Sequence, residues 1–200
     1  MTGTVAAVVL AAGQSSRLGW PKQLLDLGGV PLVTRVVRTA FAAGLSDVIV
    51  VTGAAADRVE TAVAALHPAI AFNPRFAEGQ STSLAVGIAA VPEDADAAIV
   101  LLGDQPGVDP AVIRAVVAAF RESGAAIVAP VYGKILGNPV LFRRDLFPDL
   151  RALTGDEGAR ALIRSRMADV HRVPVPGDAP PPDIDTEADY QAAVAAMERG

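Results

Sequence analysis

The amino-acid sequence predicts an α/β fold with a mostly parallel sheet and helices on both of its faces. Over the first 130 residues, short apolar runs rich in β-branched residues alternate with alanine-rich segments of helical periodicity. Strands and helices that alternate at this spacing form right-handed crossovers in a parallel sheet. The runs at residues 5–10 (VAAVVL) and 97–102 (AAIVLL) are apolar throughout, as expected for strands that are covered on both faces.

Local signals place each element of this alternating pattern. Leu32, Val36 and Ala40 lie on one stripe and Gly44 follows them, which predicts an amphipathic helix and its end. Asp109 and Pro110 suit the cap and the first position of another helix. In chain order, we expect strands at 5–10, 48–51, 69–72, 97–102 and 125–130, and between them helices at 31–43, 55–66, 81–90 and 110–121.

The alternating pattern weakens after residue 130. Residues 131–142 contain strand-like pieces interrupted by Gly133, Gly137 and Pro139. Beyond them we expect a short helix through Leu146, a helix at 157–166, a strand at 170–173, a proline-rich loop at 177–182 and a helix at 186–199 with Thr186 as its cap. Because no repeat and no linker is visible, we expect one domain over residues 1–200, in which residues 131–200 elaborate the first 130.

Composition excludes several classes of protein. With 52% hydrophobic and 20% charged residues, the chain can bury a core and does not resemble a disordered segment. No apolar run reaches the roughly 18 residues of a membrane-spanning helix, and the first ten residues lack the basic region of a secretory signal. The absence of cysteine excludes disulfides and thiolate metal sites and favours a cytoplasmic location.

The charge balance argues against nucleic acid as a partner. The formal net charge is −5 and only 4% of the residues are aromatic, so the chain has neither a positive field nor stacking platforms for bases. Any anionic ligand must therefore be held by local groups. Only two residues, Lys22 and Lys134, are lysine.

The loop after the first strand carries residues suited to a triphosphate. It reads AAGQSSRLGWPK over residues 11–22, and its small residues let backbone N–H groups approach an anion. Ser15 and Ser16 add hydroxyl groups, and Arg17 and Lys22 add positive charge. Neither the Walker phosphate loop nor the G-x-G-x-x-G fingerprint fits the glycine spacing. The alternative is an ordinary loop with solvated charges.

Carboxylates follow a strand and precede the last helix. Asp104 comes just past the run at 97–102, at the sheet edge where the first loop is also expected. Asp183 and Asp185 point the same way if their segment is extended. Mg²⁺ prefers a few carboxylate and phosphate oxygens, so Asp104 and one of these aspartates are candidate ligands. The alternative roles are a turn for Asp104 and helix capping for Asp183 or Asp185.

Five strings in order resemble one enzyme family. LAAGQSSRLGWPK at 10–22, GDQP at 103–106, GNPVLF at 137–142, GDEGAR at 155–160 and DIDTEADY at 183–190 are similar to motifs of the molybdenum cofactor cytidylyltransferases, within the superfamily of MobA-like nucleotidyltransferases. The resemblance runs from about residue 5 to residue 190. It implies a three-layer, Rossmann-like nucleotidyltransferase fold and a Mg²⁺-dependent enzyme. The implied reaction transfers CMP from CTP to molybdopterin cofactor and releases pyrophosphate.

The resemblance also implies site residues. Residues 1–130 would form the nucleotide-binding half and residues 131–200 the acceptor side. Arg17, Lys22 and Asp104 would be catalytic, and Asp104 and Asp185 would bind Mg²⁺. The ligand-binding residues would be Leu10, Ala11, Ala12 and Gly13 at the base and ribose, Ser15, Arg17 and Lys22 at the triphosphate, Asn73, Ser81 and Ser83 bordering the base and sugar, and Asn138, together with residues 155–160, facing the pterin.

The sequence departs from the family pattern at three positions. Asn138 stands where members often have His, Glu187 where they often have Pro, and Leu18 where Met is common. The Asn138 change bears most on the acceptor side. Ala12, where guanylyltransferases often have Gly, favours cytidine, although one methyl group discriminates weakly.

Other functions stay open on the sequence. One is a nicotinamide-dependent oxidoreductase of the same superfamily that acts on a quinone-like pigment, although the dinucleotide fingerprint is missing. Another is a non-catalytic nucleotide-binding maturation factor for a molybdenum hydroxylase, which would then be a partner. A third is a cytidylyltransferase for a sugar or alcohol phosphate. Arg160 and Arg164, four residues apart on a predicted helix, either bind an acceptor phosphate or form a solvated face.

Overall fold

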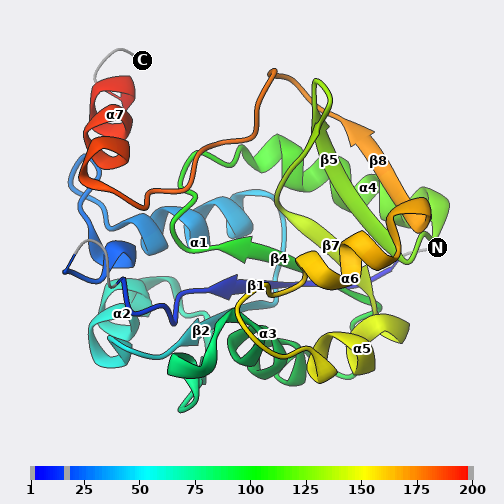
Figure 1. Cartoon of the computed structure of the whole chain (residues 1–200), viewed down its shortest axis with the longest axis horizontal. Coiled ribbons are helices and arrows are strands. Elements are labelled where there is room, and N and C mark those ends of the chain that lie inside the picture. The colour runs from blue at the N-terminus through cyan, green and yellow to red at the C-terminus, as the bar shows by residue number, and fades with distance from the viewer. Residues whose placement is uncertain (1–2, 16–18, 198–200) are drawn as a thin grey trace.

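An eight-stranded sheet forms the centre of the molecule (Figure 1). The computed structural model describes residues 3–15 and 19–197. The strand order is β3-β2-β1-β4-β7-β5-β6, and β8 pairs with β5. The strands are β1 Val5–Leu10, β2 Val48–Thr52, β3 Ala69–Phe72, β4 Ala97–Leu102, β5 Ile127–Tyr132, β6 Ile135–Leu136, β7 Val140–Arg143 and β8 Val170–Pro174.

The sheet is mostly parallel, with two antiparallel strands, β6 and β7, in its second half. The pairs β1–β2, β1–β4, β2–β3 and β5–β8 are parallel, whereas β7 runs antiparallel to both β4 and β5, and β6 is antiparallel to β5. The predicted parallel sheet is therefore confirmed. Its strand order could not be read from the sequence, because β7 follows β5 in the chain but lies between β4 and β5.

Helices cover both faces and give the predicted three layers. The helices are α1 Leu32–Ala42, α2 Ala56–Val63, α3 Gln80–Ala89, α4 Pro110–Ser123, α5 Phe147–Ala152, α6 Arg160–Ser165 and α7 Glu187–Met197. Side chains of α1, α2 and α4 share one core cluster with the sheet, and those of α3, α5 and α6 share the other. Figure 1 shows α1 above β1 and β4, and α3 and α5 below them.

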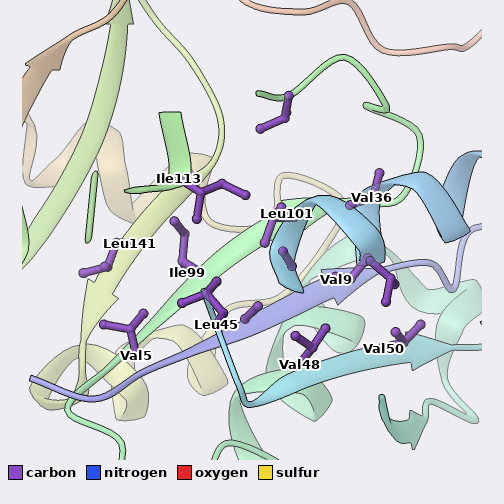
Figure 2. Packing of buried hydrophobic residues seen from close by; sticks show 14 of the residues in the cluster. Val5, Val9, Val36, Leu45, Val48, Val50, Ile99, Leu101, Ile113 and Leu141 are labelled. Atoms are coloured by element: carbon purple, nitrogen blue, oxygen red, sulfur yellow. The ribbon is translucent and has the colours of Figure 1, made fainter. Parts of the chain in front are cut away.

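The sequence of β1 is apolar without interruption because both faces of this strand are buried. Val5, Ala7 and Val9 enter the cluster under α1 and α4, whereas Ala6 and Val8 enter the opposite cluster. Figure 2 shows the first of these clusters, with valines of β1 and β2 beside isoleucine and leucine side chains of β4. Successive side chains of a strand alternate between faces, so a strand with two helical layers has no position for a polar residue.

The helix ends follow the sequence signals. Asp109 caps α4, with its Oδ1 accepting from the backbone N of Ala111 at 2.7 Å. Thr186 and Asp189 form a reciprocal pair at the start of α7: Asp189 N donates to Thr186 Oγ1 at 3.2 Å and Thr186 N donates to Asp189 Oδ2 at 2.8 Å. The helix predicted at 157–166 is shorter, because only 160–165 are helical.

None of the described helices is both long and apolar enough to cross a membrane.

Candidate functional site

The parallel pairing of β1 and β4 brings two loops to the same edge of the sheet. Leu10 and Leu102, the last residues of these strands, are paired in register. The backbone N of Gly103 donates to the carbonyl oxygen of Leu10 at 2.9 Å. A Cβ atom at Gly103 would lie 3.0 Å from that oxygen, which is a tight contact that glycine avoids. The loop after β1 and Asp104 therefore leave the sheet side by side.

The buried side chain of Gln23 holds the loop after β1 in place. Its side chain is only 3% exposed, and its Nε2 donates to the carbonyl oxygen of Gly13 at 2.9 Å. Ser15 has the positive φ of 53° and accepts at its Oγ from the backbone N of Lys22 at 2.8 Å. These bonds connect residues 13–15 to the short 3-10 helix Lys22–Leu24. Gln23 is not among the predicted site residues, because its only signal in the sequence is its position beside Lys22.

Lys22, Asp104 and Asp185 meet at this edge. The Lys22 Nζ contacts Asp104 and lies 2.6 Å from Asp185 Oδ1. Burial lowers the pKa of the Lys22 ammonium, but the charges and hydrogen bonds of the two aspartates outweigh it and raise this pKa above its usual 10.5. The three groups therefore form a partly buried ion cluster with one positive and two negative charges.

The segment before α7 delivers Asp185 to the cluster. The backbone N of Ile184 donates to the carbonyl oxygen of Asp104 at 3.1 Å. The Ile184 side chain is 1% exposed and packs on Leu27 and Leu32. Helix α7 closes the same small cluster through Tyr190. An apolar anchor between two aspartates therefore fixes the direction of both carboxylates.

A polar cavity of about 620 Å³ opens beside the ion cluster. Its volume lies in the range of sites for small ligands. Eight of the predicted site residues line it: Leu10, Ala12, Gly13, Ser15, Lys22, Ser83, Asp104 and Asp185. The remaining walls are Gln14, Gln23, residues 76–80, Leu102, Gly155 and Asp156. The N-terminus of α3 is fastened to the last two of these, since Gln80 N donates to Asp156 Oδ1 at 3.2 Å.

Four predicted ligand-binding residues lie elsewhere. Ala11, Asn73 and Ser81 are buried and are not part of the cavity wall. Asn73 donates from its Nδ2 to Ser83 Oγ at 3.0 Å and to Thr82 Oγ1 at 2.9 Å, so it orients a residue of the wall. Asn138 lines a second cavity. Arg17, predicted to be catalytic, and its neighbours Ser16 and Leu18 lie outside the described residues.

A second cavity, of about 490 Å³, is lined by Gln105 and Asp183, which are close in the chain to Asp104 and Asp185 of the ion cluster. Asn138 donates from Nδ2 to Gln105 Oε1 at 3.1 Å, and Gln105 Nε2 donates to the Pro181 carbonyl oxygen at 3.4 Å. Arg160, Ile163 and Arg164 of α6, residues 136–138 and 180–182, Val140 and Asp183 complete the wall. Asp104 and Asp185 line the first cavity, whereas their chain neighbours Gln105 and Asp183 line the second. The two cavities therefore share one wall.

Asp183 is an unusual part of that wall. Its Oδ1 is buried and has no hydrogen-bond partner among the residues that the structure describes. Burial raises the pKa of this carboxyl above its usual 3.8, and the negative charge of Asp104 raises it further, with a smaller contribution from Asp185. The sequence predicts Asp183 only as an alternative metal ligand to Asp185 or as a helix cap.

The carboxylates fit a divalent cation that arrives with phosphates. Two aspartates, Asp104 and Asp185, face the first cavity. Over residues 3–15 and 19–197, no three His, Cys, Asp or Glu side chains form a complete metal-binding group. Mg²⁺ is commonly held by one or two carboxylates, substrate phosphates and water rather than by an all-protein cage. The donor set therefore matches such a cation and leaves positions for phosphate oxygens.

Known proteins resemble this chain over nearly its whole length. The chain is 33% identical to the purine catabolism protein PucB of Bacillus subtilis over 95% of this chain and 96% of that protein. It is 32% identical to the nicotine blue oxidoreductase of Paenarthrobacter nicotinovorans over 91% and 92% of the two chains. A structure of Rv0371c from Mycobacterium tuberculosis in complex with manganese superposes with a TM-score of 0.84 and 31% identity, covering 96% of this chain and 99% of that chain.

A family model extends over most of the molecule. It matches residues 7–172, which include the loop after β1, Asp104 and all strands but the start of β1 and the end of β8. These residues carry the nucleotidyltransferase fold that the five strings predicted. The chain belongs to the family described as the MobA-like NTP transferase domain.

Proposed function

We propose that this protein is a divalent-metal-dependent nucleotidyltransferase that transfers CMP from CTP to a molybdopterin-type acceptor and releases pyrophosphate. The observation that carries the proposal is the meeting of Lys22, Asp104 and Asp185 at the wall between two cavities. A transfer between two substrates needs both of them at one set of charged groups. A cytoplasmic location and a molybdenum hydroxylase as partner remain part of the proposal.

The first cavity suits the nucleoside triphosphate. Ala12, Gly13 and Ser15 line one wall, and their small side chains let backbone N–H groups approach phosphates closely. Ser83 and the segment 76–80 also line this cavity, and they are the candidate surroundings of the sugar and base. Ala12 is 3% exposed and its carbonyl oxygen accepts from Ala54 N at 3.2 Å. Ala12 stands where glycine would leave slightly more room, which favours a pyrimidine base weakly.

The second cavity suits the acceptor. Arg160 and Arg164 lie on its rim, one turn of α6 apart. Arg164 already pairs with Glu157, whereas Arg160 has no ion-pair partner within the described part of the chain. Arg160 is therefore the better candidate for an acceptor phosphate. Gln105 and Asn138 present amide groups on the same side.

The transfer reaction requires the two substrates to be positioned and does not require a general base. An ionised acceptor phosphate attacks the α-phosphorus in line, the bond to the bridging oxygen of pyrophosphate breaks, and no proton must be removed first. A bound divalent cation would supply neutralisation of phosphate charge. Lys22 would stabilise the charge that develops on the leaving group, and Asp104 and Asp185 would orient the cation.

Pyrophosphate release tests the proposal. The protein is incubated with Mg²⁺ and each of the four nucleoside triphosphates, with and without molybdopterin cofactor. We expect release only when the cofactor is present, and fastest with CTP. Asp104→Asn should lower kcat about 100-fold or more, as the loss of one charge-stabilising group does in other enzymes. Release that needs no acceptor, or full activity of Asp104→Asn, would contradict the proposal.

A second candidate function rests on the nicotine blue oxidoreductase. That relative matches this chain over nearly its whole length. If this chain is an oxidoreductase, a nicotinamide cofactor should be consumed in the presence of a quinone-like pigment, and no pyrophosphate should appear with any triphosphate. A non-catalytic maturation factor would instead bind CTP in the first cavity without turnover. Pyrophosphate release, nicotinamide consumption and CTP binding, measured on the same protein, therefore separate the three functions.

A further inference from the structure

The ammonium of Lys22 lies where a divalent cation would have to bind. Its Nζ contacts Asp104 Oδ2 and is 2.6 Å from Asp185 Oδ1. A metal ion bound to both carboxylates must come within about 2.1 Å of their oxygens. An ammonium and a metal ion cannot share that space, and their positive charges repel each other. We call this contact of Lys22 with Asp104 and Asp185 the lysine bridge.

We propose that Lys22 is a stand-in cation: it occupies the metal site of the nucleotide-free protein and moves to the phosphates when metal and nucleotide bind together. This inference rests on the proposed function, because it assumes that Asp104 and Asp185 hold the divalent cation. It adds a step that the proposed function does not contain, namely the displacement of one cation by another.

The lysine bridge is built so that only its side chain needs to move. The backbone of Lys22 is fixed by its bond to Ser15 Oγ at 2.8 Å and by the buried neighbour Gln23. The four-carbon stem carries a compact charge on flexible bonds. The Lys22 side chain is 19% exposed and that of Asp185 is 41% exposed. Both residues line the first cavity, so the bridge is accessible from it. Residues 12–15, the candidate phosphate wall, line that same cavity.

The bridge also explains how two aspartates can face each other without a metal. Asp104 and Asp185 would repel one another, and Asp183 adds a third carboxyl two residues from Asp185. The ammonium compensates part of this negative charge. If it leaves for water, the carboxylates lose their partner; if it leaves for a triphosphate, it gains another anion while the metal takes its place.

The consequence is a coupling between metal and nucleotide. In the absence of nucleotide, a metal ion displaces Lys22 from the carboxylates into water, where the ammonium gains no new anionic partner. The metal ion alone should therefore bind weakly. Nucleotide phosphates offer the lysine a new partner, so they should strengthen metal binding, and by reciprocity metal should strengthen nucleotide binding. Removing the ammonium should raise the affinity for free metal and reduce the coupling.

Binding of Mn²⁺ without nucleotide tests the displacement. Electron paramagnetic resonance of free Mn²⁺ would be followed during titration of wild type, Lys22→Met and Lys134→Met. Lys134, the other lysine, is exposed in the turn between β5 and β6, so it is a matched control for lost charge. We expect Lys22→Met to bind Mn²⁺ about ten-fold more tightly than wild type, and Lys134→Met to differ by less than about two-fold. Equal affinity of wild type and Lys22→Met overturns the inference.

A second measurement uses the wild-type protein alone, so it does not depend on the fold of a variant. Because the chain has only two lysines, mass spectrometry can follow the acetylation of each one. Without metal, Lys22 should react more slowly than Lys134. Saturating Mn²⁺ should speed the reaction of Lys22 and leave Lys134 unchanged, and Mn²⁺ with a non-hydrolysable CTP analogue should slow Lys22 again. If bound Mn²⁺ leaves the acetylation rate of Lys22 unchanged, the inference is overturned.

These measurements separate the inference from the proposed function. Neither needs turnover or an acceptor. If Mn²⁺ displaces Lys22 but no triphosphate yields pyrophosphate, the inference stands and the transferase reaction does not. If pyrophosphate is released while Lys22 stays on the aspartates in the presence of bound Mn²⁺, the reverse holds.

Discussion

Gln23 joins the loop after β1 to the 3-10 helix that carries Lys22. Its amide binds the Gly13 carbonyl oxygen at 2.9 Å from a nearly inaccessible position. Replacement by leucine leaves that oxygen without its donor, which costs about 1–3 kcal/mol when a buried group loses its partner. We expect Gln23→Leu to lower stability by that amount and to raise the KM for nucleotide more than it lowers kcat, because the loop loses its support.

The control for Gln23 is another glutamine. Gln191 is exposed on α7, where its side chain reaches Glu187 of the same helix. Gln191→Leu should change the free energy of unfolding by no more than about 0.5 kcal/mol. Urea unfolding and initial-rate measurements on both variants check the prediction. Equal effects of the two substitutions would show that Gln23 has no special role.

Asp183 makes stability depend on pH. Its folded pKa is raised by burial, and then by the charge of Asp104, so the folded chain binds this proton more tightly than the unfolded chain does. Stability therefore falls as pH rises from below the ordinary value of 3.8 through the folded pKa. We expect Asp183→Asn to raise Tm at neutral pH and to make little difference in acid, where the wild-type carboxyl is protonated. Melting curves across pH check the sign; a variant that is less stable at neutral pH contradicts it.

At the scale of elements, α3 approaches the sheet through Gly87. A Cβ at this position would clash with Val8 of β1 and lie 2.9 Å from Val51 Cγ2 of β2. A glycine-to-alanine change in an unrestrained helix stabilises by about 0.5–1 kcal/mol. Here we expect Gly87→Ala to destabilise by about 1–3 kcal/mol, because the core must move to accept the methyl group. Thermal or urea unfolding decides between the two signs.

The structure of α3 also shows which parts of the site the sequence could predict. Ser83 was predicted to border the ligand and does line the first cavity. Ser81 and Asn73 carry the same kinds of groups, yet both are buried, and Asn73 instead orients Ser83. Local patterns reveal that a polar residue stands near a strand end or a helix start. They do not reveal which side of the helix faces a cavity, because packing sets that rotation.

At the scale of the whole molecule, long-range pairing set the limits of prediction. The parallel strands of the first half follow from their continuous apolar runs, and with them the shared edge for Gly13 and Asp104. The insertion of β7 between β4 and β5 does not, since the strands that pair there are not neighbours in the chain. Nor does the choice of Asp185 for the ion cluster, which depends on Ile184 packing against Leu27 and Leu32.

The same topology predicts that the two substrates can be weakened separately. The first cavity is built mainly from residues before position 105, and the second mainly from residues after it. Arg160, on the rim of the second cavity, contributes nothing to the wall of the first. We expect Arg160→Ala to raise the KM for the acceptor about ten-fold, as the loss of one charge-assisted contact does, and to leave nucleotide binding unchanged.

Arg151 provides the matched control, because it is an exposed arginine at the end of α5 that lines neither cavity. Arg151→Ala should leave both KM values at the wild-type level. Initial rates at varied acceptor and varied nucleotide, with direct calorimetry of nucleotide binding, separate the two constants. If Arg160→Ala weakens nucleotide binding as much as acceptor binding, the cavities do not hold different substrates. Because Asp104 and Asp185 line one cavity while Gln105 and Asp183 line the other, that result would also remove the reason for placing the transfer at their shared wall.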